Sequence, residues 1–112
     1  MAKLVSTNPA NGEKVGEVTM STKADVERAV AHAKKAFPGW RALSVAQRVV
    51  YVKTFRKLLA QHKEELATLT TKEMGKPIRE ARDDVDWELK FIDWYIENAE
   101  KRFIKKGIAI HV

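Results

Sequence analysis

The chain has 112 residues, enough for one small domain at most. Its composition of 45% hydrophobic and 32% charged residues is globular and argues against intrinsic disorder. The absence of cysteine excludes disulfides, thiolate metal sites and a thiol nucleophile within these residues.

Residues 4–20 are predicted to form a β-hairpin. Val15 and Val18 lie among polar residues in a short strand-like pattern. The preceding segment Asn8-Pro9-Ala10-Asn11-Gly12 combines a proline turn starter with an Asn-Gly pair suited to positive φ. Because an isolated two-stranded ribbon is only marginally stable in water, we expect this hairpin to lie against helices.

A first helix is predicted to begin near Thr22, which forms a capping box with Asp25. We expect it to end at Phe37-Pro38-Gly39, because proline breaks helices and glycine often follows a helix end. The apolar residues of this helix repeat along one stripe, which consists of Val26, Ala29, Val30, Ala33 and Phe37.

Two further helices are predicted between residues 44 and 75. Ser44 and Gln47 form a second capping box, and Gly75 suits a left-handed helix end. A weakly marked break near residues 61–63 separates the two helices. The expected inner stripe of the first of them consists of Val49, Val52, Phe55 and Leu59.

Residues 78–103 are predicted to form one long helix that is apolar on two opposite sides. Pro77 suits its first turn, where the missing N–H group has no helical partner to lose. The inner sector consists of Ile78, Ala81, Val85, Leu89, Ile92, Ile96, Ala99 and Phe103. The opposite side carries Trp87, Phe91 and Trp94. A helix that is apolar on two sides needs cover on both, so we expect these three residues to form an interface.

The sequence therefore predicts a mainly α (α+β) fold in a single segment over residues 1–112. A hairpin at 4–20 is followed by about four helices over 22–103, the last of them long. Residues 104–112 are expected to be a separate tail, in which residues 107–112 alternate weakly like a strand.

Several short motifs, taken in order, resemble the amino-terminal segment of the aldehyde dehydrogenase family. They cover roughly the first 102 residues and are Asn8-Pro9-Ala10-Asn11-Gly12-Glu13, Asp25-Val26-Glu27-Arg28-Ala29-Val30, Ala33-Lys34-Lys35-Ala36-Phe37 with Gly39-Trp40-Arg41, Glu65-Leu66-Ala67, and Glu73-Met74-Gly75-Lys76-Pro77-Ile78-Arg79-Glu80-Ala81. The Glu-Met-Gly-Lys-Pro-Ile form of the last motif is most similar to the branch that acts on succinate semialdehyde and related aldehydes. Residues 104–112 do not continue the family pattern and are expected to be a non-family tail.

The resemblance implies an oxidoreductase that attacks an aldehyde with a Cys thiolate, passes hydride to NAD or NADP and hydrolyses the thioester with help from a Glu. It also implies that this segment packs along a Rossmann-like cofactor domain. None of the cofactor-loop, Cys or Glu motifs occurs here, and the five glycines form no phosphate loop. We therefore assign no catalytic, cofactor-binding or metal residue, and expect a truncated part that is inactive alone.

Two alternative functions come from other classes. One is a helical self-association module, a homo-oligomer through the last helix. The other, less favoured, is a basic nucleic-acid-binding domain, which the net charge of +6 allows but no recognition motif supports. His32, His62 and His111 are interpreted as solvated, and Asp83, Asp84 and Asp86 as complements to the helix dipole.

The predicted location is the cytoplasm. The amino terminus has no apolar core of the kind found in secretory signals. No run approaches the roughly 18 apolar residues that span a bilayer, so no membrane partner is expected.

Overall fold

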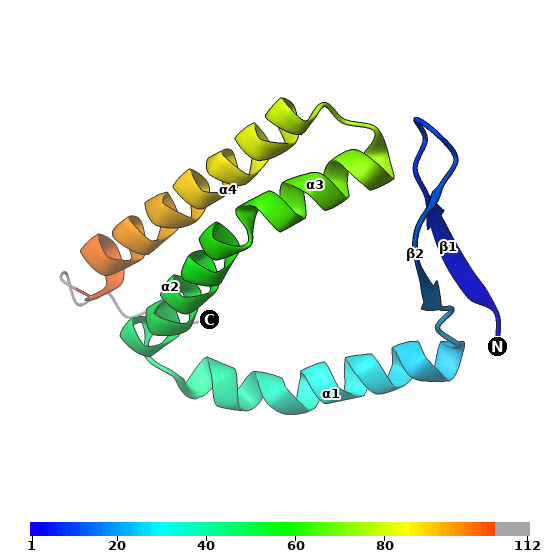
Figure 1. Cartoon of the computed structure of the whole chain (residues 1–112). Coiled ribbons are helices and arrows are strands. Elements are labelled where there is room, and N and C mark those ends of the chain that lie inside the picture. Colours follow the sequence, from blue (N-terminus) through cyan, green and yellow to red (C-terminus); the bar gives the residue numbers. More distant parts are fainter. Residues whose placement is uncertain (105–112) are drawn as a thin grey trace.

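A computed structural model describes residues 1–104 of the chain, a two-stranded hairpin followed by helices. The strands are β1 (Lys3–Thr7) and β2 (Lys14–Thr19), and the helices are α1 (Lys23–Ala42), α2 (Val45–Gln61), α3 (Lys63–Met74) and α4 (Ile78–Ala99). A π-helical turn, η1 (Glu100–Ile104), continues α4. The elements form an open frame, with α2, α3 and α4 on one side and α1 on the other (Figure 1). The predicted mainly α fold is confirmed.

The hairpin forms where the turn signals predict it. β1 and β2 pair antiparallel, from Lys3 opposite Thr19 to Thr7 opposite Lys14. The Asn8 side chain accepts a hydrogen bond from the Ala10 amide at 2.9 Å. Gly12 adopts a φ of 77°, a conformation that glycine reaches without a steric penalty.

The hairpin touches the helices chiefly at the carboxyl end of α3. Gly75 ends α3 in the left-handed conformation, with φ 73°. A Cβ atom at this position would lie 3.0 Å from Cγ of Pro9, so glycine serves both the helix end and the close approach of the hairpin turn. Leu4 and Val18 remain exposed, so most of the hairpin lacks the helical cover that the sequence predicts.

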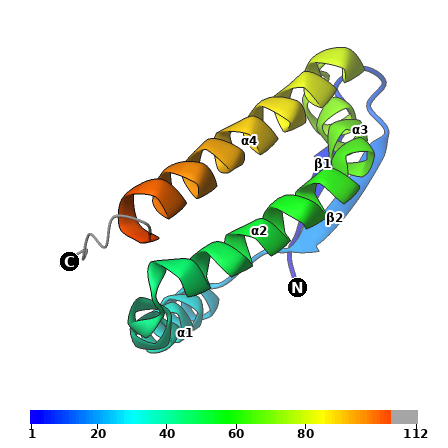
Figure 2. The ribbon, with the colours of Figure 1, turned by 90° about the vertical axis from the view of Figure 1, so that its left-hand side faces the viewer.

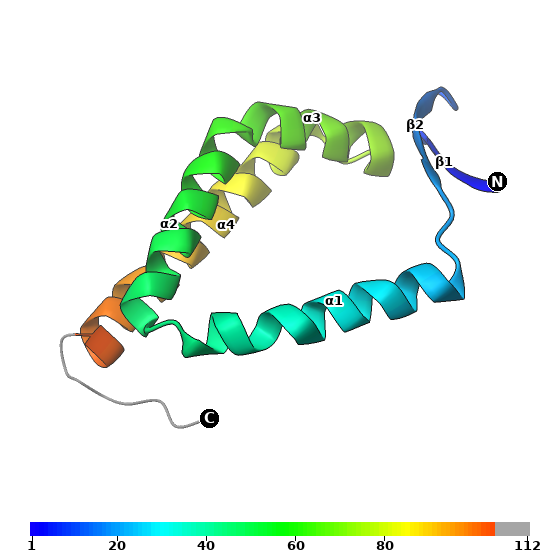
Figure 3. The same cartoon turned by 90° about the horizontal axis from the view of Figure 1, so that it is seen from below.

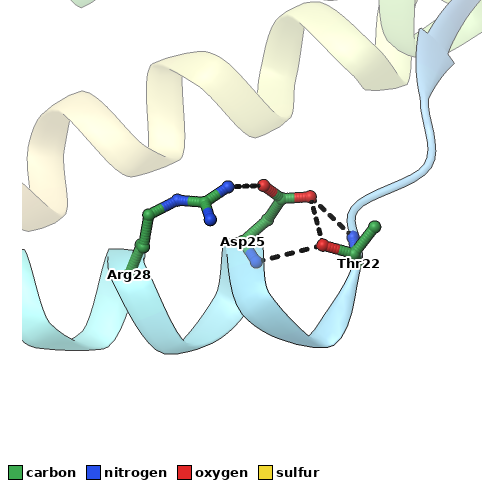
Figure 4. A network of polar contacts seen from close by, with 3 residues as sticks. All are labelled: Thr22, Asp25 and Arg28. Atoms are coloured by element: carbon green, nitrogen blue, oxygen red, sulfur yellow. Dashed lines mark hydrogen bonds and ion pairs between the residues drawn. The ribbon is translucent and has the colours of Figure 1, made fainter.

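The capping box predicted at the start of α1 is present (Figure 4). The Thr22 amide donates to Oδ2 of Asp25 at 2.7 Å, and the Asp25 amide donates to Oγ1 of Thr22 at 3.2 Å. The Thr22 amide, together with the Thr22 hydroxyl, which also donates to Oδ2 of Asp25 at 2.7 Å, holds the pKa of the Asp25 carboxyl below its ordinary value. The other carboxylate oxygen pairs with Arg28 one turn later.

The predicted end of this helix at residues 37–39 is wrong. α1 continues through Pro38 to Ala42 and ends at Leu43, whose backbone is extended. Proline cannot donate the hydrogen bond of its own turn, but the residues after it can still hold helical dihedral angles. Pro38 therefore removes one backbone hydrogen bond from α1 without ending the helix.

α2, α3 and α4 form the packed part of the described chain. α2 and α3 follow one another, and α4 runs back alongside both of them (Figures 1 and 2). The buried apolar residues among those described are Val49, Ala67, Ala81 and Leu89, one or two from each helix. Every residue of the predicted inner sector of α4 is buried or half-buried, as its helical spacing predicts. Phe55 is the exception in the α2 stripe, because it is exposed.

Ion pairs reinforce this small apolar contact. Arg56 on α2 donates from Nε and Nη2 to both carboxylate oxygens of Asp93 on α4, at 2.8 and 2.9 Å. These bonds hold the pKa of the Asp93 carboxyl below its ordinary value. Nζ of Lys63 on α3 lies 2.6 Å from Oδ1 of Asp86 on α4. Arg82 on α4 also pairs with Glu64 on α3, and Lys53 on α2 pairs with Glu100 at the start of η1.

Candidate interaction surface

The outward side of α4 presents a row of aromatic side chains to solvent. Trp87, Phe91 and Trp94, the three residues predicted to form an interface, are 65%, 50% and 55% exposed. Tyr95 joins them with 56% exposure. We call these four residues the aromatic face of α4. Tyr95 is not among the three residues predicted from the sequence, although its position four residues after Phe91 places it on the same side of a helix.

Three of the four rings contact one another. The rings of Phe91 and Tyr95 meet edge to face, with centroids 5.1 Å apart and planes at 68°. Trp94 and Tyr95 do the same at 5.0 Å and 87°. Edge-to-face packing is a favoured aromatic arrangement, so the rings form one ordered surface. With Lys90 they line a shallow open hollow of about 380 Å³.

The hollow is open to solvent and is lined mainly by apolar surface, with Lys90 and the Tyr95 hydroxyl as the polar groups among its lining residues, so it differs from the enclosed pockets that hold small molecules. Apolar surface of this extent on a monomer usually marks a contact with another protein surface. The interface role of Trp87, Phe91 and Trp94 stays a prediction.

A second apolar surface follows α1 and the adjoining side of α2. α1 buries none of its residues, and its predicted stripe is exposed at Val26, Val30 and Phe37. Trp40, near the end of α1, packs edge to face on Tyr51 of α2 at 5.6 Å. Viewed from below, α1 runs along the side of the frame opposite α3 (Figure 3). The apolar stripe of α1 is therefore present on one side of the helix, but no other described element covers it.

The radius of gyration and the accessible surface of the chain are both larger than those of a compact domain, as two uncovered surfaces require. Its radius of gyration is 18.7 Å, whereas a compact domain of this length has about 13 Å. Its accessible surface is 9094 Å², against about 6300 Å² for a compact monomer of 12.8 kDa. The excess is the surface that a covering partner would be expected to bury.

The other residues singled out by sequence have separate partners. Nδ1 of His62 lies 2.8 Å from Glu65, and both side chains are exposed. Asp84 pairs with Lys76, whereas Asp86 pairs with Lys63. His111 lies outside the described residues. Within residues 1–104, no three His, Cys, Asp or Glu side chains gather in an arrangement suited to a metal ion.

The relationships of the chain agree with its architecture. The model of the Aldehyde dehydrogenase family matches residues 2–109. The chain belongs to the aldehyde dehydrogenase family. The match runs beyond residue 104, into the segment that was expected to be a non-family tail.

The relatives within the aldehyde dehydrogenase family include several semialdehyde dehydrogenases. The NADP(+) succinate-semialdehyde dehydrogenase GabD of Escherichia coli (strain K12) is 36% identical over 95 residues, which are 85% of this chain and 20% of that protein. The glutarate-semialdehyde dehydrogenase of Pseudomonas putida is 38% identical over the same shares. The crystal structure of an aldehyde dehydrogenase from Brucella melitensis biovar abortus 2308 superposes on 89% of this chain and 21% of its own, with a TM-score of 0.84 and 31% identity.

This family member thus spans about a fifth of the length of the relatives it matches. Among its described residues, none of the helices is both long and apolar enough for a bilayer crossing.

Proposed function

We propose that the chain serves as the amino-terminal structural segment of an NAD(P)-dependent aldehyde dehydrogenase. Its parent reaction is the oxidation of an aldehyde, of the succinate semialdehyde class, to the acid. The 112 residues act as a truncated part that has no dehydrogenase activity alone, and their location is the cytoplasm. The observation that carries this proposal is the family match to the amino-terminal fifth of semialdehyde dehydrogenases.

The chemistry of the family supports the lack of activity of these residues alone. The resemblance implies a Cys nucleophile, and the chain has no cysteine that could form a thiohemiacetal. Gly12, Gly16, Gly39, Gly75 and Gly107 are too far apart for a glycine-rich turn around a pyrophosphate.

The exposed surfaces support a structural role. The stripe of α1 and the exposed rings of Tyr51 and Phe55 on α2 are apolar surfaces that a larger domain would bury. At roughly 25 cal/mol per Å² of apolar area, covering even a few hundred Å² would stabilise the chain by several kcal/mol. In this proposal, the remainder of a dehydrogenase provides that cover.

A chimera tests the proposal. Residues 2–109 replace the matching segment of the Escherichia coli succinate-semialdehyde dehydrogenase, and reduction of NADP by succinate semialdehyde is measured. We expect a soluble, active chimera. The control chimera carries Tyr51→Lys and Phe55→Lys, which place charges on the surface that the host must cover, and it should lose activity. An inactive first chimera beside an active parent enzyme would contradict the structural role.

The isolated chain tests the second half of the proposal. Purified 112-residue chain is mixed with succinate semialdehyde and either NAD or NADP, and formation of the reduced cofactor is followed. We expect none above the rate without protein. Aldehyde-dependent reduction would show that these residues contain a catalytic site.

The aromatic face of α4 favours a second candidate function, self-association into a homo-oligomer through the last helix. Trp87→Lys combined with Trp94→Lys should dissociate such an assembly, because the charges would enter a desolvated contact. Both positions are exposed in the single chain, so the helical circular dichroism should be unchanged. Light scattering gives the mass, and a wild-type monomer at tens of micromolar would count against this function.

A further inference from the structure

We infer that two copies of the chain pair antiparallel along α4, about a twofold axis that passes beside Phe91. The inference rests on self-association, the second function proposed above, and adds its partner, direction and register. It follows from the order of charged and aromatic residues along the outward side of α4 and η1.

The first step is that three residues share this side of the helix. Glu80, Phe91 and Arg102 are spaced by eleven residues, and eleven residues make about three full α-helical turns. Arg102 lies in η1, where the wider turn shifts its direction by a few tens of degrees at most. All three residues are exposed. Phe91 is therefore the centre of a face with an acid at one end and a base at the other.

The second step is what a twofold axis at Phe91 brings together. In an isologous contact, a residue on one side of the axis meets the residue at the same distance on the other side. Trp87 then lies opposite Tyr95 of the second copy, and Phe91 meets its own counterpart. Glu80 lies opposite Arg102 of the second copy, and by symmetry Arg102 lies opposite Glu80 of the second copy. Acid therefore meets base at both ends of an aromatic centre.

The charges distinguish this arrangement from a parallel one. Parallel pairing in register would place Glu80 against Glu80 and Arg102 against Arg102, and like charges in contact repel. Antiparallel pairing also aligns the helix dipoles favourably. Within the described residues, neither Glu80 nor Arg102 forms an ion pair that the dimer would have to break.

The area of the face fits a weak dimer. An aromatic side chain can bury roughly 150–250 Å², and these four are half exposed or more, so each copy offers about 500 Å². Complete burial of the four rings in both copies would remove about 1000 Å² from solvent, as an upper bound. This lies in the range of weak, transient interfaces. We therefore expect association in the micromolar range, detectable by sedimentation at tens of micromolar.

Charge reversal tests the register. Glu80→Arg or Arg102→Glu alone should weaken dimerisation about tenfold, because each creates two like-charge contacts. The double variant Glu80→Arg with Arg102→Glu should regain wild-type affinity, since it restores both opposite-charge contacts. Lys23→Glu, on an exposed site of α1, is the control for net charge and should change affinity less than twofold. A double variant that is as weak as the single ones would overturn the register.

Cross-linking gives a second readout, because the chain has no native cysteine. A short bismaleimide should join Phe91→Cys chains to each other. Glu80→Cys chains should not react with themselves but should react with Arg102→Cys chains in a mixture. Self-linked Glu80→Cys would indicate parallel pairing and overturn the inference, as would a monomeric wild-type chain. Neither result would change the activity of the chimera, so failure here is distinguishable from failure of the dehydrogenase proposal.

Discussion

Replacement of Leu89 by alanine tests whether the inner side of α4 holds the packed part of the chain together. Leu89 is 8% exposed and is one of the few buried apolar residues. Leucine-to-alanine changes in cores cost about 2–5 kcal/mol, and the small open core here favours the lower half, about 3 kcal/mol. With a urea m value of about 2 kcal/mol/M, the unfolding midpoint should fall by about 1.5 M.

The measurement is urea unfolding followed by far-ultraviolet circular dichroism at a concentration where the chain is monomeric. Phe91→Ala is the matched control, since it lies two residues away on the exposed side, and it should cost less than about 1 kcal/mol. Leu89→Val, with an expected cost of about 1 kcal/mol, keeps the test usable should the alanine variant be unfolded without urea. Equal losses for Leu89→Ala and Phe91→Ala would refute the assignment of the two sides.

Three further predictions concern local features. Gly75→Ala should destabilise the chain by about 1–2 kcal/mol in urea unfolding, because alanine is strained at φ 73° and its Cβ would crowd Pro9; an unchanged midpoint would show that α3 ends differently. Ser44→Ala should cost about 1 kcal/mol by loss of the α2 cap, whereas Ser44→Asn should be nearly neutral. The pKa of Asp93 is lower in the folded chain, so its pair with Arg56 stabilises the fold above the ordinary carboxyl pKa of about 4, and this contribution is lost as the pH falls below it. Between pH 5 and pH 3, the unfolding midpoint should therefore fall more for the wild type than for Asp93→Asn, and equal falls would show that the pair contributes nothing.

The features that the sequence predicted correctly depend on near neighbours in the chain. The capping boxes at Thr22 and Ser44 and the left-handed end at Gly75 are set within one helical turn. The hairpin turn is likewise set by the side chains of Asn8 and its neighbours. The two sides of α4 follow from a spacing of 3.6 residues per turn, which holds wherever the helix packs.

The failures concern features that near neighbours do not decide. Pro38 reads as a helix end, yet α1 continues because only one hydrogen bond is lost there. The spacing of Phe55 predicts an inner residue, but its side chain is exposed. The same limit applies to the stripe of α1, which the pattern marks as apolar but which has no described neighbour to cover it.

The sequence by itself determined the elements, their caps and the apolar side of each helix, because these follow from backbone geometry and hydrogen bonds over a few residues. Only the tertiary structure decided which apolar sides are covered within the chain. It joined the inner side of α4 to α2 and α3 around Ala67 and Leu89 and left the aromatic face exposed. Periodicity shows that a side avoids water, but its cover depends on contacts between residues far apart in the chain, which no local pattern encodes.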